Sequence, residues 1–501
     1  MAEDSDYVFI SRDEFQPVSA TVGNNKALKV KAQHHPHLGP EIVQKRSDKP
    51  QISRSKKLRL EQANKLKAYS VPIAPYNIGF LKEISCYVDG IAESLWPVNE
   101  KIHDNPELGF KEYIAHETLT NFMQTQVGWV VKSSVYGLET AWTAEYDSGR
   151  PGPVISFNVE MDALIGIGHS CGHNLIATAS LGAALATASI MRSHQPNIPG
   201  KIILFGTPAE EGGGGKIKLI NAGAYRDHAV DLSLMSHPGS TADCALMRTT
   251  AYTSFRVEYF GEEAHAAANP WLGINALDAL ITAYNALSVL RQQTMPGDII
   301  QGHITHGGAA PNIIHAYAAG VFAVRADTLA RLTQLKVKVD ACFEAGAVAT
   351  GARLVVTPLQ EYANHVPNRV LARSYTRYWN ELVPEKDGED AYEPPTSKIP
   401  LDQDVDQMRG VTRASTDQGN VSYEMPSLHV GFSIVPGPQG QGPHNPEFAE
   451  AAGKRDAFYR CLRVSKALAG TALDVLTQRG LLKQVKDAWK ADMAQSEKTE
   501  V

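Results

Sequence analysis

Residues Val154-Ile155-Ser156-Phe157-Asn158-Val159 form a short, almost wholly apolar run, which is typical of a buried strand. A segment rich in Ala and Leu follows from Leu175 to Met191 and is expected to be a buried helix. Two further apolar runs with strand composition lie at 201–207 and 231–236. Strands that alternate with helices in this way predict a mainly parallel sheet with helices on both faces, an α/β fold.

Residues able to bind a metal ion lie where these strands end. Ligands in open α/β sheets bind at the carboxyl ends of the strands. Asp162 follows the first strand, Glu210 and Glu211 follow the second, and His237 follows the third. The sequence therefore predicts that these side chains meet at one edge of the sheet.

Cys171 and His173 stand two positions apart in a loop that enters the predicted helix. A set of thiolate, imidazole and carboxylate groups suits zinc or manganese with an activated water better than it suits a closed structural site. The helix dipole at this position is expected to lower the pKa of the thiol. Taken alone, Cys-Gly-His is more typical of a buried structural cysteine beside a surface histidine, so the metal interpretation depends on the whole set.

Each of the other candidates also has an ordinary structural interpretation. Glu210 and Glu211 precede four glycines and could form a solvated turn. His237 could be a packed histidine at a strand end. His444 lies in a loop rich in Gly and Pro, where surface exposure is the usual outcome. The metal-binding interpretation of these residues depends on their occurring together.

The character of the sequence changes near Thr249. Residues 254–259 alternate as a half-exposed strand does, and the pattern beyond them predicts strand-helix-strand-strand-helix-strand. Asn269 is expected to cap the first helix of this unit, with Pro270 at its first position. Leu277, Leu280, Tyr284 and Leu287 are expected to form the buried stripe of that helix.

We therefore expect an inserted α+β domain over 247–360, serving as a lid or dimerisation domain. A discontinuous catalytic domain is expected over 76–246 and 361–490. Residues 1–75 are predicted to be a disordered tail, and 384–406 a surface loop. One helix from about Phe448 to Leu476 is expected to close the fold, with fraying after about residue 490.

The composition narrows the class of protein. The chain has 501 residues, enough for two folded domains, and a net charge of -6 that argues against a nucleic-acid partner. Its five scattered cysteines favour a reducing compartment. No secretory signal is visible at the start, and no segment approaches about 20 uninterrupted apolar residues. We expect a cytoplasmic protein with no membrane partner.

Several ordered motifs together resemble the M20 metallopeptidase family, in its amidohydrolase-like branch, over roughly 80–485. They are Asn105-Pro106-Glu107-Leu108-Gly109-Phe110, Met161-Asp162-Ala163-Leu164, His169-Ser170-Cys171-Gly172-His173, Glu210-Glu211, Ala264-His265-Ala266-Ala267 and Gly307-Gly308-Ala309-Ala310-Pro311-Asn312. Within the branch, the stretches 166–174 and 415–422 look most like the M20 domain-containing protein 2 group, which includes dipeptidases favouring basic C-terminal residues. Asn174 departs from the wider branch, where aspartate is common.

The resemblance implies a role for each candidate residue. The two-metal centre, of zinc or manganese, would be held by Cys171, His173, Glu211, His237 and His444. Glu210 would be the general base, Asp162 would orient a metal ligand, and His265 would stabilise the oxyanion during closure, in its own or a partner subunit. Asn312, Arg325 and His169 would contact the substrate.

The implied reaction is hydrolysis of an amide or peptide bond in a dipeptide or an N-acyl amino acid, in a possible homodimer formed through the inserted domain. Asn312 and Arg325 could equally be a turn residue and a strand-surface charge. Two alternatives to hydrolysis stay open: an enzyme that forms amides or acts on a specialised amide metabolite, and a non-catalytic binding protein that keeps the fold.

Overall fold

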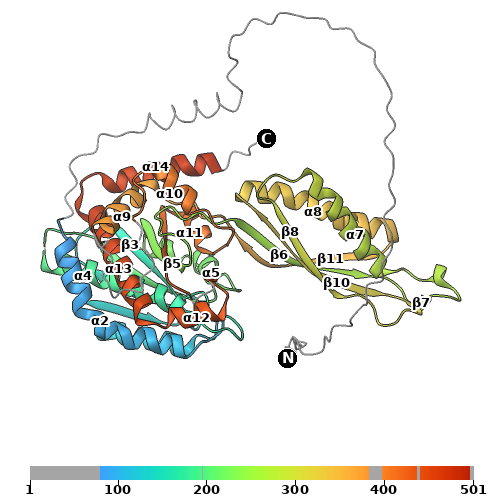
Figure 1. Cartoon of the computed structure of the whole chain (residues 1–501), viewed down its shortest axis with the longest axis horizontal. Helices are drawn as coiled ribbons and strands as arrows, with labels where there is room; N and C mark the ends of the chain where they lie inside the picture. Colours follow the sequence, from blue (N-terminus) through green and yellow to red (C-terminus); the bar gives the residue numbers. More distant parts are fainter. Residues whose placement is uncertain (1–78, 195, 383–397, 437–439, 497–501) are drawn as a thin grey trace, which may run out of the picture. The chain divides into compact units, whose positions relative to one another are not determined.

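The computed structural model describes residues 79–194, 196–382, 398–436 and 440–496 (Figure 1). The predicted tail 1–75 lies outside these residues, as does most of the predicted loop 384–406. Between Asn77 and Val501 the chain forms a single compact unit. Its described residues form two large sheets and one two-stranded sheet.

The larger sheet has six strands in the order β1-β2-β4-β3-β5-β12. Strands β4, β3, β5 and β12 run parallel, and β2 and β1 continue the sheet antiparallel. This confirms the predicted mainly parallel sheet. The strands are β1 (Trp129–Ser133), β2 (Trp142–Asp147), β3 (Val154–Glu160), β4 (Lys201–Thr207), β5 (Leu232–Gly239) and β12 (Ser427–Ser433).

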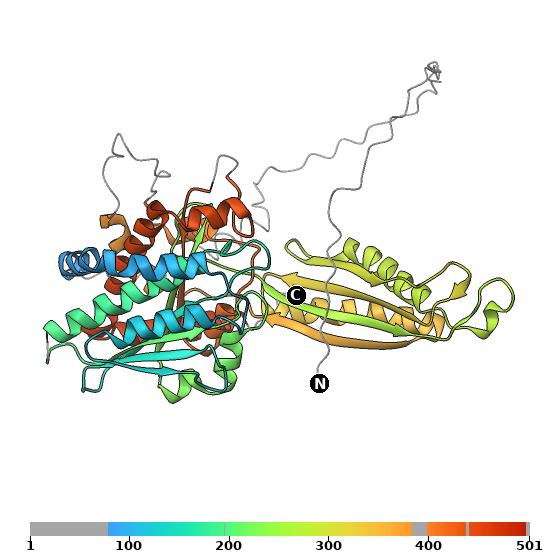
Figure 2. The ribbon, with the colours of Figure 1, turned by 90° about the horizontal axis from the view of Figure 1, so that it is seen from below.

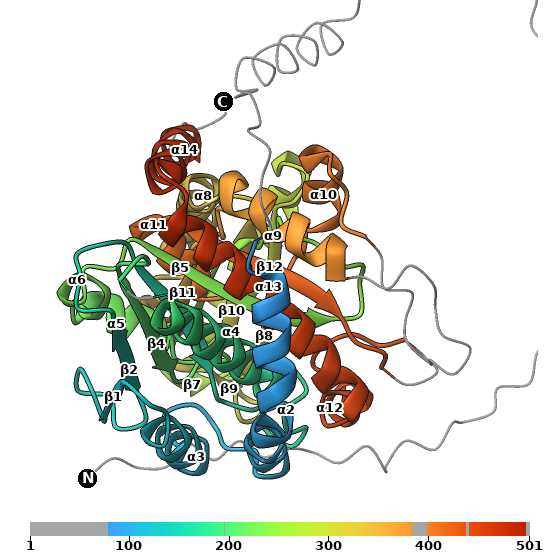
Figure 3. The same ribbon diagram turned by 90° about the vertical axis from the view of Figure 1, so that its left-hand side faces the viewer.

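Alternate side chains of β4 show how the sheet is covered on both faces. Ile202 and Leu204 belong to one buried cluster, and Ile203 and Phe205 belong to another. The first cluster includes helices that pack on one another in Figure 3: α2 (Leu81–Asp104), α4 (His173–Ser193), α9 (Arg369–Leu382) and α13 (Arg455–Thr477). The second includes α5 (Gly215–Asn221), α6 (Ala224–Asp227) and α11 (Gln418–Glu424).

Helix α4 is the central helix of this domain. Among the described residues it alone has the length and apolar composition of a membrane span. However, 94% of that apolar window is buried inside the protein. The composition of α4 is therefore that of a core helix packed on β3, β4 and β5.

The smaller sheet has the order β11-β6-β10-β8, and its strands run side by side in Figure 2. Helices α7 (Ala276–Leu290) and α8 (Leu329–Thr350) pack together on one face of it. The strands are β6 (Ala251–Phe260), β8 (Ile299–His306), β10 (Tyr317–Ala326) and β11 (Arg353–Tyr362). A separate pair, β7 (Ala264–His265) and β9 (Ile313–Ile314), follows the far end of β6. We call the region from β6 to β11 the small domain.

The first helix of the small domain begins later than predicted. Asn269 and Pro270 start only a short 3-10 turn (Pro270–Leu272), and Asn275 is the residue that caps α7. Its side chain accepts hydrogen bonds from the backbone of the next turn. Tyr284 was also misplaced: it is 40% exposed, because alanines fill the helix face between the buried Leu280 and Leu287.

The C-terminal region also differs from the prediction. The single helix expected over 448–476 is two helices, α12 (Pro446–Ala452) and α13, separated at Gly453. A β-carbon at Gly453 would lie 2.4 Å from the His103 ring, so the chain turns there against α2. Helix α14 (Leu481–Ser496) continues beyond residue 490, because Met493 on its inner face is buried.

The remaining described helices support the edges of the large domain. Helices α2 and α3 (Tyr113–Gln124) lie on either side of the Asn105–Phe110 motif. Helix α10 (Gln403–Arg409) was not predicted; it begins inside the expected loop 384–406 and ends three residues beyond it. Strands β1 and β2 were also missed, since β1 is mostly exposed and has no long apolar run.

Candidate metal centre

The predicted metal ligands meet at the carboxyl edge of the parallel strands. His237 lies near the end of β5, and Glu211 follows β4. Cys171 and His173 flank Gly172 at the start of α4. His444 precedes α12, and its backbone N–H donates to Ser170 O at 2.8 Å, which ties the last loop to the cysteine loop.

The ligand atoms fall into two groups that share one sulfur. Cys171, His173 and His237 form the first group, and Cys171, Glu211 and His444 form the second; within each, the ligand atoms lie within 4.8 Å of one another. This arrangement suits two cations with the Cys171 sulfur between them.

The separations agree with shared metal coordination. Ligand atoms that share a tetrahedral zinc at about 2.0 to 2.3 Å lie about 3.3 to 3.6 Å apart. Cys171 Sγ lies 3.3 Å from His237 Nε2, and His444 Nε2 lies 3.4 Å from Glu211 Oε2. The positions are therefore close to those that bound ions require.

In each histidine of the first group, one ring nitrogen lies beside a protein oxygen and the other is turned to the centre. His237 Nδ1 lies 2.6 Å from Pro238 O, which fixes the proton on that nitrogen and leaves Nε2 as a donor to metal. His173 Nδ1 lies 3.2 Å from Asp162 Oδ1. The other carboxylate oxygen of Asp162 accepts from the backbone N–H of Glu211 at 2.9 Å. Asp162 therefore contacts two ligand residues from behind, as a ligand-orienting carboxylate does.

Buried polar atoms without hydrogen bonds also indicate a cation. His173 Nε2 and Glu211 Oε1 are buried and have no hydrogen-bond partner among the described residues. Buried polar atoms of native proteins are normally satisfied by protein groups, water or ions. His173 Nε2 and Glu211 Oε1 lie 3.8 Å apart, and two positive ions, one held by each ligand group, would satisfy them. The residues present thus fit a metal centre.

The turn that carries Glu210 and Glu211 has a strained backbone and is fixed by a hydrogen bond to a buried carboxylate. Ala209 has a positive φ of 55°, a conformation that costs of order 1–3 kcal/mol outside glycine. Its backbone N–H donates to the buried carboxylate of Glu112 at 2.8 Å. Glycines let the surroundings approach: a β-carbon at Gly109 would lie 2.8 Å from that of Ala209. The Asn105–Phe110 motif therefore supports the turn.

Burial shifts the pKa values of the acidic groups at the site. Burial raises the pKa of Glu210 well above its usual range, and the nearby carboxylates of Glu160 and Glu211 add to the rise. Burial also raises the pKa of the Cys171 thiol, and Glu211 adds to that rise. The predicted lowering of this pKa by the helix dipole is wrong for the protein alone, because burial and the adjacent carboxylate outweigh the helix end. A cation is needed to favour the thiolate.

The remaining predicted residues lie outside this cluster. His265 and Asn312 adjoin each other at the β7–β9 pair, where Asn312 O accepts from the backbone of Ala266. Both are exposed. His265 Nδ1 accepts from two backbone N–H groups at 3.2 Å, so its proton lies on the exposed Nε2. Because both lie away from the ligand cluster, the oxyanion role of His265 and the substrate role of Asn312 stay predictions.

Arg325 and His169 have different surroundings from His265 and Asn312. Arg325 is at the end of β10 that adjoins the large domain, where it donates to Ser415 Oγ at 2.6 Å and covers the ring of Tyr252 at 4.3 Å. His169 is only 2% exposed, and burial together with nearby His173 lowers its pKa to about 3. The structure thus separates Arg325 from Asn312, although both are predicted to bind substrate.

Three buried charged residues beside the centre were missed by the sequence analysis. Lys216 Nζ lies 2.6 Å from both Glu160 Oε1 and Asp417 Oδ1, and all three side chains are inaccessible to solvent. Carboxylate oxygens of Glu160, Glu210 and Asp417 lie within 4.8 Å of one another. The only sequence signals were the position of Glu160 at a strand end and of Asp417 in the quoted 415–422 stretch.

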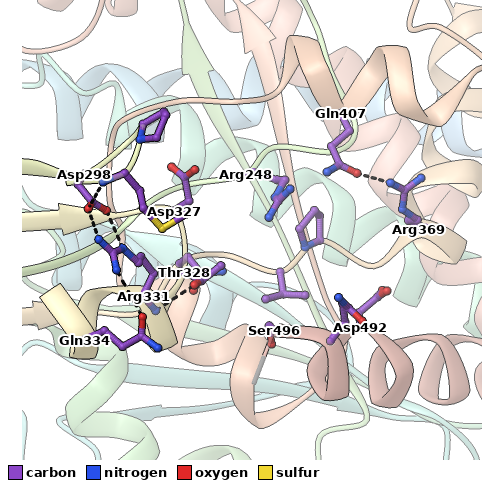
Figure 4. Close-up of a pocket in the computed structure, with 16 residues that line it drawn as sticks. Arg248, Asp298, Asp327, Thr328, Arg331, Gln334, Arg369, Gln407, Asp492 and Ser496 are labelled. Atoms are coloured by element: carbon purple, nitrogen blue, oxygen red, sulfur yellow. Dashed lines mark hydrogen bonds and ion pairs between the residues drawn. The ribbon is translucent and has the colours of Figure 1, made fainter. Parts of the chain in front are cut away.

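A separate cavity of about 470 Å³ lies where the chain passes between the two sheets. Figure 4 shows Asp298 facing Arg331 on one side and Arg369 reaching Gln407 on the other. Arg248, which precedes β6, also lines it. None of the predicted site residues is among its lining residues, so the cavity is distinct from the metal centre.

Comparison with known proteins adds independent information. The family described as "Peptidase dimerisation domain" matches residues 250–350. The Xaa-Arg dipeptidase of Mus musculus is 38% identical over 82% of this chain and 92% of its own length. That of Homo sapiens is 36% identical over 83% and 93%. One polypeptide of the p-aminobenzoyl-glutamate hydrolase of Escherichia coli is 28% identical over 58% of this chain and 64% of its own length.

Solved structures support the fold. A dinuclear metal binding peptidase from the M20 family, of Bacillus subtilis, superimposes with a TM-score of 0.55 at 15% identity, over 77% of this chain and 99% of that one. An aminobenzoyl-glutamate utilization protein from Klebsiella pneumoniae superimposes with a TM-score of 0.54 at 17% identity, over 79% and 99%. At such low identity the likeness concerns the fold alone.

Proposed function

The chain belongs to the M20 peptidase family and is a hydrolase, and we propose that it cleaves the amide bond of a dipeptide or N-acyl amino acid with Glu210 as general base. The observation that carries this proposal is the pair of ligand groups sharing Cys171, with the carboxylate of Glu210 beside them. Two divalent ions in such a centre lower the pKa of a water and polarise a carbonyl.

Glu210 supplies the proton transfer in this proposal. Its carboxylate lies 3.9 Å from His173 Nε2, and its ligand atom lies within 4.8 Å of those of His173 and Glu211, one from each ligand group. Burial and the neighbouring carboxylates raise its pKa, and a raised pKa makes a carboxylate a stronger acceptor for the proton of the attacking water. Tyr362 donates to the backbone carbonyl of Glu210 at 2.5 Å and so fixes the turn against the base of the small domain.

We propose dipeptides with a basic C-terminal residue as the substrate class. Support comes from the two relatives named Xaa-Arg dipeptidase, which match nearly their whole length. N-acyl amino acids are the alternative, favoured by the relative named p-aminobenzoyl-glutamate hydrolase. An amide-forming role uses the same transition state and is the remaining alternative. The non-catalytic alternative loses its support, since every predicted ligand and the base are present.

A substrate panel tests the proposal. Purified protein loaded with zinc, manganese or cobalt is assayed against Xaa-Arg and Xaa-Lys dipeptides, neutral dipeptides and N-acyl amino acids. We expect the highest kcat/KM for a basic C-terminal residue. Cleavage of none of these compounds with any of the three metals would contradict hydrolysis of this substrate class. A preference for N-acyl amino acids would redirect the assignment to amidohydrolase.

We further propose that two subunits share the catalytic residues. Tyr252, near the start of β6, lies against Tyr362, which bonds the Glu210 backbone. The ten residues of β6 span about 30 Å, so its far end and His265 lie well away from the centre of their own chain. A partner subunit could therefore supply its own His265 to this centre. The matched dimerisation domain and the exposed apolar side chains Ile281 and Tyr284 on α7 support a dimer.

Mixing two inactive variants tests this sharing. His265→Ala should lower kcat by about 10² to 10³, because an oxyanion donor is lost. Dimers of His265→Ala mixed with Glu210→Gln should regain about a quarter of the wild-type activity, since half of random dimers are mixed and each has one complete site. The measurement is activity after co-refolding or subunit exchange. No recovery in a mixture shown to contain heterodimers would contradict a shared site.

We also propose that the metal is zinc or manganese and that the protein is located in the cytoplasm. All five cysteines are free, which supports a reducing compartment. Cell fractionation checks the location.

A further inference from the structure

Glu160 is the last residue of β3 and is completely buried. Its two carboxylate oxygens have different surroundings. Oε1 accepts from Lys216 Nζ at 2.6 Å. Oε2 has no hydrogen-bond partner among the described residues and lies 3.4 Å from His173 Nε2. One oxygen is therefore anchored, and the other faces the nitrogen that is directed at the metal centre.

We propose that Glu160 is a sixth ligand of this centre, binding through Oε2 the ion held by Cys171, His173 and His237. This inference rests on the metal centre of the proposed function. The 3.4 Å separation of Oε2 from His173 Nε2 is the distance expected for two atoms that share one tetrahedral ion, about 3.3 Å. With Glu160, the first ion would have four protein donors instead of three. The Glu160 carboxylate is grouped within 4.8 Å with Glu210 and Asp417 and not with Cys171 and His237, so Oε2 would turn toward these two ligands when the ion binds.

Lys216 and Asp417 hold this carboxylate in place. The Lys216 ammonium lies between Glu160 and Asp417, and its backbone N–H donates to the second oxygen of Asp417 at 2.9 Å. A buried ammonium is costly unless it is paired, so these contacts leave the lysine little freedom to move. Because Lys216 occupies Oε1, only Oε2 of Glu160 can turn to the centre.

In this proposal the two ions differ in their number of protein donors and in their exposure to solvent. Four donors around the first ion form the closed, buried type of site, which binds metal tightly. The second ion would have three protein donors, Cys171, Glu211 and His444, and the His444 side chain is 56% exposed. An open position next to solvent is what a catalytic ion needs. The second ion would therefore face the substrate and be released more easily.

The competing interpretation is that Glu160 only forms ion pairs, with Lys216 and with a protonated His173. Two substitutions distinguish the alternatives. Glu160→Gln keeps the shape and removes the charge. Glu160→His offers a metal-binding nitrogen but no partner for an ammonium, so it restores a metal ligand without restoring an ion pair.

The test is zinc binding to the full-length, metal-free chain, measured by competition with a chromophoric chelator. Wild type should bind two ions, one more tightly. In Glu160→Gln the tighter ion should bind at least about tenfold more weakly, and Glu160→His should recover part of this loss. Asp474→Asn is the matched control, because it neutralises another buried carboxylate paired with a basic side chain, Arg377, in the large domain. It should leave both affinities unchanged.

Folding is checked by thermal melting of each variant, and Glu160→His carries the test if Glu160→Gln does not fold. Unchanged affinities for both ions in a folded Glu160→Gln, or a Glu160→His variant no better than Glu160→Gln, would overturn the role of Glu160 alone. A wild-type chain that binds fewer than two ions would overturn the metal centre itself. The readout does not depend on activity, so the two failures are distinguishable.

Discussion

Glu210→Gln is expected to lower kcat about a thousandfold while both metal ions stay bound. A general base contributes about 10² to 10⁴ to the rate, and glutamine cannot accept the proton. The amide has nearly the shape of the carboxylate, so the buried site keeps its packing around position 210, which is 6% exposed. Steady-state kinetics together with elemental analysis of the same sample measures both quantities.

Glu211→Gln is the informative comparison, because it changes the neighbouring carboxylate in the same turn. Glu211 lies with the ligand atoms of Cys171 and His444, so this variant should lose bound metal along with activity. Burial opposes the ionisation of Glu211, but His444 and His173 lower its pKa, as suits a ligand carboxylate. A metal-loaded Glu210→Gln variant with near-normal turnover would refute Glu210 as the base.

Cys171→Ala is expected to lose most of its bound metal at both positions. The Cys171 sulfur is the one atom common to the two ligand groups. It is buried, and burial raises its thiol pKa although nearby His173 lowers it, so a bound cation would favour the thiolate there. Elemental analysis after dialysis should find less than one ion per chain.

Cys461→Ala is the matched control for this variant. Cys461 is also free and fully buried, but it lies in the apolar core on α13. Its replacement should destabilise the protein slightly and leave metal content unchanged. Full occupancy of both ions in Cys171→Ala would contradict the shared sulfur.

The core of the fold was predictable because its pattern is unambiguous. Every residue of β3 is buried, and α4 is buried almost all round, so their composition alone indicates a parallel sheet wrapped by helices. The helix start at Asn275 was not predictable in the same way. Asn269-Pro270 and Asn275 are both suitable caps, and only the surrounding packing selects the second.

Some residues of the candidate site could also be predicted from the sequence, and others could not. Its ligands were predictable because Cys, His and adjacent Glu residues follow successive strands, and such strands end at one edge. Glu160 and Lys216 carry no such signal. Neither belongs to a recognisable ligand pattern, and only the fold brings Lys216 from α5 within 2.6 Å of Glu160 on β3. The pKa of Cys171 was misjudged because burial cannot be inferred from a helix start.

The most direct test of the metal centre is anomalous diffraction from crystals of the zinc-loaded chain, recorded at the zinc edge. Two peaks about 3.5 to 4 Å apart are expected, one on each side of the Cys171 sulfur. One should adjoin His173 and His237, and the other Glu211 and His444. A single peak, or peaks that do not border Cys171, would contradict the shared two-ion centre.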